Sequence, residues 1–131
     1  MSSHPLCDVI AAADRAISAE DFDGLMAFYA DDATLVVAPN LIATGKAQIL
    51  KAFIGIAQHF GHRLTVSQRQ MKVVESGDTA LVLAETVLDT EDAEGLAVSI
   101  LRRATYVFRK SPEGDWLCAV DNSYGTGLLG R

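Results

Sequence analysis

The spacing of hydrophobic residues changes about halfway along the chain. In the first half they recur every three or four positions, which is the spacing of amphipathic helices. Three segments show this pattern: about 6–19, 22–29 and 46–60. Between the second and third, an apolar run at 33–37 ends at Pro39-Asn40 and predicts a short strand. The first half therefore predicts three helices and one strand.

The second half consists of β-rich runs separated by turn signals. Ser76-Gly77-Asp78-Thr79 fits a two-residue hairpin turn, and Ser111-Pro112-Glu113-Gly114 has Pro and Gly where a type I turn favours them. The runs that these signals bound are 62–75, 78–89, 96–110 and 115–124. Helices followed by consecutive hairpins are typical of an α+β domain with an antiparallel sheet.

One of these runs is apolar on both of its faces. The residues that alternate along one side are Val82, Ala84, Thr86 and Leu88, and those along the other are Leu81, Leu83, Glu85 and Val87. A sheet with one solvated face would alternate apolar and polar residues instead. We expect one face to cover the helices and a pocket, and the other to contact a second copy of the chain, so that the protein forms a homodimer through the sheet.

Length and composition indicate one domain over residues 1–131, with 125–131 as a loose tail. Half of the residues are hydrophobic, which is enough for a packed core. The formal charge of −6, without any cluster of Lys or Arg, disfavours nucleic acid and anionic membranes as partners.

The two cysteines, Cys7 and Cys118, lack the spacing of a disulfide framework or a zinc site. No signal-peptide pattern or long apolar run is present, so we expect a cytoplasmic protein. The sequence has no glycine-rich phosphate loop. His59 and His62 have no acidic or thiol ligand at suitable spacing, so they do not indicate a metal site. We therefore expect neither a metal nor a cofactor.

Three segments together resemble a known superfamily. They are the stretch from Asp21 to Thr34 (DFDGLMAFYADDAT), the helix start Gly45-Lys46-Ala47-Gln48-Ile49, and Gly114-Asp115-Trp116 in a late hairpin. This pattern resembles the nuclear transport factor 2-like superfamily, which includes SnoaL-like polyketide cyclases and ketosteroid isomerases. The resemblance implies helices packed on a strongly curved sheet, a cone-shaped half barrel with a pocket. The scaffold hosts enzymes, binding modules and assembly domains, so it does not by itself assign an activity.

The isomerase residues of that superfamily are not retained here. The resemblance places the general-base carboxylate at Val37 and the oxyanion-hole tyrosine of the first helix at Ala13. The second oxyanion donor falls at or near Tyr106, which keeps a hydroxyl. Abstraction of a proton next to a carbonyl needs a base together with an oxyanion donor. We therefore expect no ketosteroid isomerase site.

Turn geometry predicts the register of each hairpin, and the register decides which side chains share a face. The predicted pairs are Tyr106 with Ala119, Gln70 with Glu85, and Glu85 with Ile100. One face then carries Gln70, Glu85, Arg102, Tyr106, Asp121 and Ser123. The opposite face carries Val82, Ala84, Arg103, Thr105, Val107, Trp116, Cys118, Val120 and Asn122. The superfamily pattern turns the first set toward the pocket, although a slip of one residue between the two central strands would move Glu85 to the opposite face.

The first set suggests a defined chemistry. Arg102 between Glu85 and Asp121 would keep both carboxylates ionised, and a carboxylate held in that way is a poor base. If only one of them pairs with Arg102, the other has a raised pKa and is able to shuttle protons. Our catalytic candidates are Asp121 for that role, Tyr106 as a hydrogen-bond donor and Arg102 as an anchor for an anion or a carbonyl. The alternative is a structural ion-pair network.

Further residues are expected to contact a ligand: Val37, Phe53, Gln70, Leu83, Glu85, Ala119 and Ser123. Two functions follow from this set. The first is a cofactor-independent isomerase, cyclase or hydratase acting on a small, apolar carbonyl compound. The second is a non-catalytic module for binding a small ligand or for dimerisation. An assembly domain for a larger enzyme is a third and weaker possibility.

Overall fold

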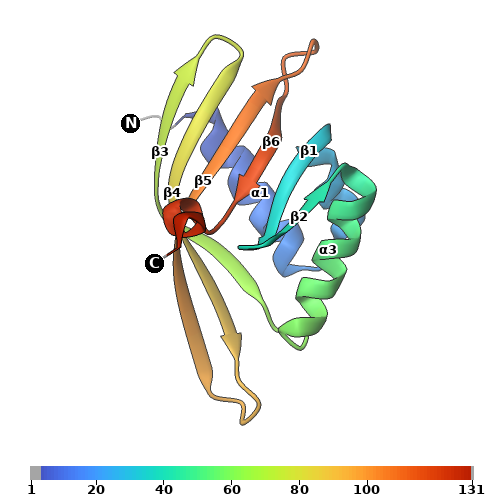
Figure 1. Cartoon of the computed structure of the whole chain (residues 1–131), viewed down its shortest axis with the longest axis vertical. Helices are drawn as coiled ribbons and strands as arrows, with labels where there is room; N and C mark the ends of the chain where they lie inside the picture. The colour runs from blue at the N-terminus through green and yellow to red at the C-terminus, as the bar shows by residue number, and fades with distance from the viewer. Residues whose placement is uncertain (1–3, 131) are drawn as a thin grey trace.

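The computed structural model describes residues 4–130, and its helices pack on a strongly curved sheet (Figure 1). The helices occupy the three predicted segments: α1 is Pro5–Ser18, α2 is Phe22–Leu25 and continues into the 3-10 helix η1, Met26–Phe28, and α3 is Lys46–His59. The strands are β1 Tyr29–Ala38, β2 Leu41–Thr44, β3 Thr65–Ser76, β4 Thr79–Glu91, β5 Ala97–Lys110 and β6 Trp116–Asn122. The α+β class and the curved, open sheet are confirmed.

The sheet is mixed rather than wholly antiparallel, which corrects one part of the prediction. Its six strands run in the order β2-β1-β6-β5-β4-β3. β1 and β6 pair in parallel, while the other neighbours are antiparallel. The sequence pattern missed β2, which returns along β1 after the turn at Pro39-Asn40. The first and last strands along the chain, β1 and β6, are therefore neighbours in the interior of the sheet.

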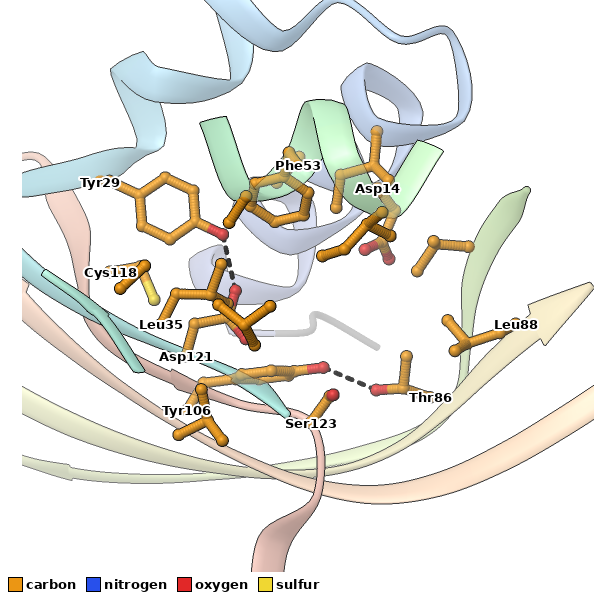
Figure 2. A pocket seen from close by; sticks show the side chains of 18 of the residues that line it. Asp14, Tyr29, Leu35, Phe53, Thr86, Leu88, Tyr106, Cys118, Asp121 and Ser123 are labelled. Carbon is orange, nitrogen blue, oxygen red and sulfur yellow. Dashed lines mark hydrogen bonds between the residues drawn. The ribbon is translucent and has the colours of Figure 1, made fainter. Parts of the chain in front are cut away.

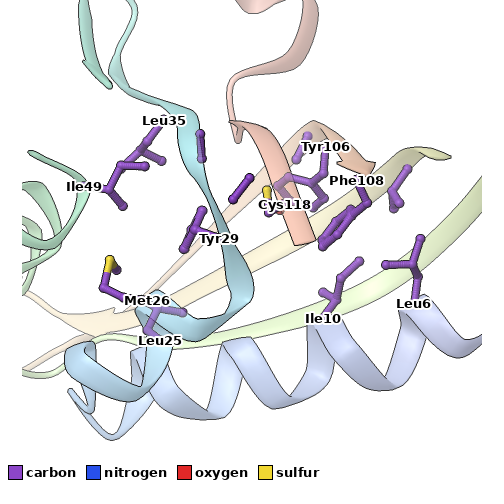
Figure 3. Close-up of a cluster of buried hydrophobic side chains, with 14 of the residues drawn as sticks. Leu6, Ile10, Leu25, Met26, Tyr29, Leu35, Ile49, Tyr106, Phe108 and Cys118 are labelled. Atoms are coloured by element: carbon purple, nitrogen blue, oxygen red, sulfur yellow. The ribbon is translucent and has the colours of Figure 1, made fainter. Parts of the chain in front are cut away.

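The core lies between the helices and the inner face of the sheet (Figure 3). Leu6 and Ile10 lie one helical turn apart on α1 and are buried, because an α-helix returns to the same face every three to four residues. Ile49 on α3 is also fully buried. Burial of one such side chain contributes roughly 1.5–3 kcal/mol, so these contacts fix both long helices against the sheet.

Two of the three predicted hairpin registers are wrong. The pairing of Gln70 with Glu85 is confirmed, but Glu85 faces Arg103 instead of Ile100, and Tyr106 faces Asp121 instead of Ala119. The loop between β4 and β5 explains the first error. The Asp92 side chain accepts hydrogen bonds from two backbone N–H groups and closes the turn. As a result, each β4 residue pairs with a β5 residue three positions further along the chain than predicted.

The new register turns Glu85 to the outer face, because an odd shift exchanges the two faces of a strand. There Glu85 Oε1 and Oε2 lie 3.7 Å from Arg69 Nε and 3.3 Å from Arg103 Nη2. Gln70 and Leu83 are exposed on the same face. Conversely, four residues predicted for the outer face pack in or against the core: Val82, Ala84, Trp116 and Cys118.

Part of the segment that we expected to be a loose tail has regular structure, and its last residue, Arg131, lies outside the described residues. Gly125–Leu129 form a 3-10 helix, η2, and the Asn122 side chain accepts hydrogen bonds from the N–H groups of Tyr124 and Gly125. Gly125 is buried at φ 55°, and an added Cβ would overlap the carbonyl oxygen of Arg103. This close approach fixes Tyr124 beside the sheet. None of the helices in residues 4–130 is long and apolar enough to span a membrane.

Candidate functional site

A cavity of about 730 Å³ lies between the inner face of the sheet and the helices. Most of its wall is apolar and comes from α1, β1, α3 and the four C-terminal strands. Figure 2 shows Asp14 reaching it from α1, while Tyr106, Thr86 and Asp121 reach it from the sheet. The polar side chains of the wall include Asp14, Gln68, Thr86, Arg102, Tyr106, Asp121 and Ser123. An apolar cavity with a few convergent polar groups is the usual form of a small-molecule site.

The structure brings together six of the ten predicted site residues. Those that line the cavity are Val37, Phe53, Arg102, Tyr106, Asp121 and Ser123. Gln70, Leu83 and Glu85 lie on the outer face for the register reasons given above. Ala119 occupies a β-bulge of β6, where the pairing with β5 shifts, and it does not line the cavity.

Asp121 is held by a tyrosine on the neighbouring strand of the sheet. The Tyr29 hydroxyl on β1 donates a hydrogen bond of 2.6 Å to Asp121 Oδ2. Burial raises the pKa of Asp121, and the hydrogen bond from Tyr29 partly opposes that shift. Asp121 Oδ1 accepts no hydrogen bond from any residue in 4–130. Asp121 is thus a carboxyl group with one oxygen fixed and a raised affinity for protons.

Arg102 does not form the predicted ion-pair unit with Glu85 and Asp121. Its Nη1 donates a hydrogen bond of 3.2 Å to Ser123 Oγ, and its guanidinium lies 4.3 Å from the centroid of the Tyr124 ring. Within residues 4–130 no carboxylate lies within 4.0 Å of Arg102. Because Arg stays protonated, the cavity wall carries a cation that stacks on an aromatic ring.

Asp14 is a buried acid that the sequence analysis missed. It is 9% exposed and accepts a hydrogen bond of 3.1 Å from Gln68 Nε2. Burial, and to a lesser extent the nearby charge of Asp121, raise its pKa to about 6, while Gln68 and Arg15 act in the opposite direction. The signal was present, because Asp14 continues the series Leu6, Ile10 at the next helical turn. An acidic residue at a core position indicates a special role or a special partner.

A chain of hydrogen bonds joins Asp14 to Tyr106. Thr86 Oγ1 donates to Gln68 Oε1 at 2.8 Å, and Thr86 Oγ1 lies 2.7 Å from the Tyr106 hydroxyl. A threonine hydroxyl has one proton, so Tyr106 must donate to Thr86 in this arrangement. This changes the role predicted for Tyr106, because its proton is not free to bind a ligand carbonyl. Burial also raises the pKa of Tyr106, which keeps the hydroxyl protonated.

One known domain family accounts for most of the chain. A sequence profile of the SnoaL-like domain matches residues 7–118. The chain belongs to the SnoaL-like domain family. No functionally curated protein matches it in sequence.

Solved structures extend this likeness to the fold. Aln2 from a Streptomyces species matches with a TM-score of 0.82 and 16% identity, covering 100% of both chains. An NTF2-like protein with a cystatin-like fold from Novosphingobium aromaticivorans matches at 0.79 and 19%, covering 96% of this chain and 87% of its own. A ketosteroid isomerase-like protein from Erwinia carotovora atroseptica matches at 0.70 and 23%, covering 87% and 88%. The superfamily inferred from the sequence is thus confirmed.

The two positions at which the resemblance places the isomerase tyrosine and general base line the SnoaL-like cavity, but they carry other residues. Ala13 and Val37 both line the cavity. Neither side chain can donate a hydrogen bond or remove a proton. Any acid–base chemistry in this cavity must therefore come from other residues, and within residues 4–130 the carboxylic acids of its wall are Asp14 and Asp121.

Proposed function

We propose that the domain binds a small, largely apolar carbonyl compound in the cavity and that Asp121 exchanges a proton with it, as in a cofactor-independent isomerase, cyclase or hydratase. The observation that carries the proposal is the Asp121 carboxyl, with one oxygen fixed by Tyr29 and the other unpartnered in an apolar wall. A general base works best when its pKa lies near the operating pH, and burial shifts Asp121 in that direction.

The remaining polar groups have roles consistent with this chemistry. Asp121 would take a proton from the carbon next to the carbonyl, and the electron pair of that C–H bond would pass to the carbonyl oxygen as an enolate. Arg102 would stabilise the negative oxygen, since it carries a permanent charge at the cavity wall. If the compound carries a β,γ double bond, the enolate is a dienolate, and return of the proton from Asp121 to the γ carbon would move the double bond into conjugation and complete an isomerisation. Tyr29 would keep the carboxyl oriented throughout.

Proton exchange measured by NMR tests the proposal without knowledge of the natural substrate. A panel of small apolar ketones in D₂O should exchange α-protons faster with the wild-type protein than with Asp121→Asn. The rate should increase as pH increases through the pKa of Asp121, because only the ionised carboxylate accepts a proton. Asp89→Asn makes the same chemical change on an exposed part of β4 and should leave exchange unchanged. Equal exchange in wild type and Asp121→Asn would remove Asp121 from the mechanism.

A non-catalytic ligand-binding module is the second candidate. It is favoured by Arg102, whose guanidinium is already held by Ser123 and Tyr124 in the manner of a fixed anchor. This function predicts that ketones or carboxylic acids raise the unfolding temperature without proton exchange. Thermal stabilisation that persists in Asp121→Asn but is lost in Arg102→Met would identify the binding module.

We also propose that the protein is a homodimer through the outer face of the sheet. This face exposes a cluster of apolar side chains, in which Val107 lies between Leu81 and Val120 on neighbouring strands. Ala84, which the sequence analysis placed at the interface, is buried on the inner face and has no part in it. Large exposed apolar patches are uncommon in monomers. Val107→Glu should dissociate the dimer in sedimentation, whereas Ile54→Glu on the exposed side of α3 should not.

A further inference from the structure

Four polar side chains from four different elements form one continuous hydrogen-bonded chain along the cavity wall. They are Asp14 on α1, Gln68 on β3, Thr86 on β4 and Tyr106 on β5. Thr86 and Tyr106 are 3% and 8% exposed, so water does not easily replace either partner. A β-bulge at Arg69 makes the chain possible, because it changes the pairing of β3 and turns Gln68 inward while Gln70 points outward.

Each hydrogen bond in this chain depends on the direction of the next. An ionised Asp14 can only accept, so Gln68 presents its Nε2 to Asp14 and its Oε1 to Thr86. Thr86 then donates to Gln68 and accepts from Tyr106. The Tyr106 oxygen is consequently left with only lone pairs for a molecule in the cavity.

We propose that the protonation state of Asp14 sets the hydrogen-bonding polarity of Tyr106 toward the cavity, through Gln68 and Thr86. A protonated Asp14 can donate to Gln68 Oε1 once the amide of Gln68 rotates by half a turn. Gln68 Nε2 then donates to Thr86, Thr86 donates to Tyr106, and the Tyr106 proton becomes free to bind a carbonyl oxygen. All four groups remain hydrogen-bonded to one another in both arrangements, and only the Tyr106 proton changes from a protein partner to the cavity.

The surroundings of Asp14 favour a change of protonation under ordinary conditions. Its pKa is raised to about 6, mainly by burial. The charged or titratable neighbours are Arg15 on α1, which favours ionisation of Asp14, and Asp121 on β6, which opposes it. Among the elements that pack on α1, β3 presents the neutral Gln68, and its charged residues Arg69, Lys72 and Glu75 are exposed. α2 carries only Asp23, which is also exposed.

This relay assigns a ligand class to each state, and the assignment rests on the proposed function of the cavity. With Asp14 ionised, Tyr106 accepts a hydrogen bond, so the cavity favours an apolar compound with a hydroxyl group, such as an enol or a phenol. With Asp14 protonated, Tyr106 donates, so the cavity favours the corresponding carbonyl. The relay would thus select between the keto and enol forms of one compound.

The relay itself can be tested without any ligand. In protein labelled with ¹³C, the Asp14 Cγ and Tyr106 Cζ signals should shift together as pH passes through about 6. Gln68→Met keeps the volume of the side chain but breaks the chain. In that variant Asp14 should still titrate, whereas the response of Tyr106 should be lost. Thr86→Val, which has the same shape as threonine, breaks the next link and should give the same result if Gln68→Met does not fold.

Three results would overturn the relay. The first is a Tyr106 signal that stays constant in wild type across the titration of Asp14, and the second is an Asp14 that does not titrate near pH 6. The third is a Tyr106 response that persists unchanged in the broken-chain variants, because it would then come directly from the charge of Asp14 or Asp121.

Matched probes test the ligand preference separately. 2-Naphthol and 2-acetonaphthone have similar apolar bodies but opposite hydrogen-bonding groups. The ratio of their dissociation constants should change about fivefold or more between about pH 5 and about pH 8 in wild type, and remain constant in Gln68→Met. If neither probe binds while Tyr106 still follows Asp14, the proposed function and the ligand preference fail and the relay stands. If both bind with a constant ratio and Tyr106 is silent, the relay fails alone.

Discussion

Asp14→Asn should make the protein more stable at neutral and alkaline pH. In the folded protein the pKa of Asp14 is raised from 3.8 to about 6. The protonated form is therefore favoured on folding, and the stability that it contributes is fully present below pH 3.8 and lost as pH rises through about 6. At about 1.4 kcal/mol per pKa unit, ionisation of Asp14 costs the folded state about 3 kcal/mol above that range.

Asparagine removes this cost and still offers an oxygen to Gln68 Nε2, which donates to Asp14 at 3.1 Å. Urea unfolding at a series of pH values should show Asp14→Asn gaining on wild type between about pH 4 and pH 6, to a constant advantage of up to about 3 kcal/mol at pH 8. Asp8→Asn, on an exposed position in the first turn of the same helix, should instead lose about 0.3–1 kcal/mol.

Parallel stability curves for wild type and Asp14→Asn would refute the reasoning, because they would mean that Asp14 ionises as easily in the folded chain as in the unfolded one. In that case Asp14 would not titrate near pH 6, as the relay requires.

Three further changes test other parts of the structure. Tyr29→Phe removes the 2.6 Å hydrogen bond to Asp121 and should destabilise the fold by about 1–3 kcal/mol in urea unfolding; an unchanged midpoint would mean that water replaces the hydroxyl. Ile49→Ala empties a fully buried position and should cost about 2–5 kcal/mol, with a smaller loss counting against the packing of α3. Gly125→Ala should lower the unfolding temperature, because the new Cβ overlaps the Arg103 carbonyl, and a neutral result would place η2 elsewhere.

The sequence predicted the helices and most strands because their signals are local. Hydrophobic spacing located α1 and α3 to within a few residues, and Gly77 located the turn between β3 and β4. Strand β2 was missed because it has four residues, of which Leu41 and Ile42 are exposed. The parallel pairing of β1 with β6 was also missed, since no local pattern records which distant strands become neighbours.

Site residues on the strands were predicted correctly only where the error in register was an even number of positions, because such an error keeps a side chain on the same face. Between β5 and β6 the observed register differs from the predicted one by two positions, one at the turn and one at the bulge at Ala119. An even difference leaves each side chain on the predicted face, so Tyr106 and Asp121 still share a face. Between β4 and β5 the error was odd, and Glu85 moved outside while Thr86 moved in. Asp14 was missed because the interpretation of α1 considered its apolar residues and not the acid among them.

The parallel pairing of β1 and β6 has a consequence for the order in which the molecule is built. Tyr29 and Asp121 are 92 residues apart in the chain, yet they share a hydrogen bond. A nascent chain on the ribosome can form the helices and the β3–β4–β5 hairpins early, because their contacts are local. The Asp121 side of the cavity wall exists only after β6 has been synthesised and inserted between β1 and β5. Ligand binding by a nascent chain should therefore begin only after β6 has left the ribosome, so that this domain gains its cavity at the end of its own synthesis.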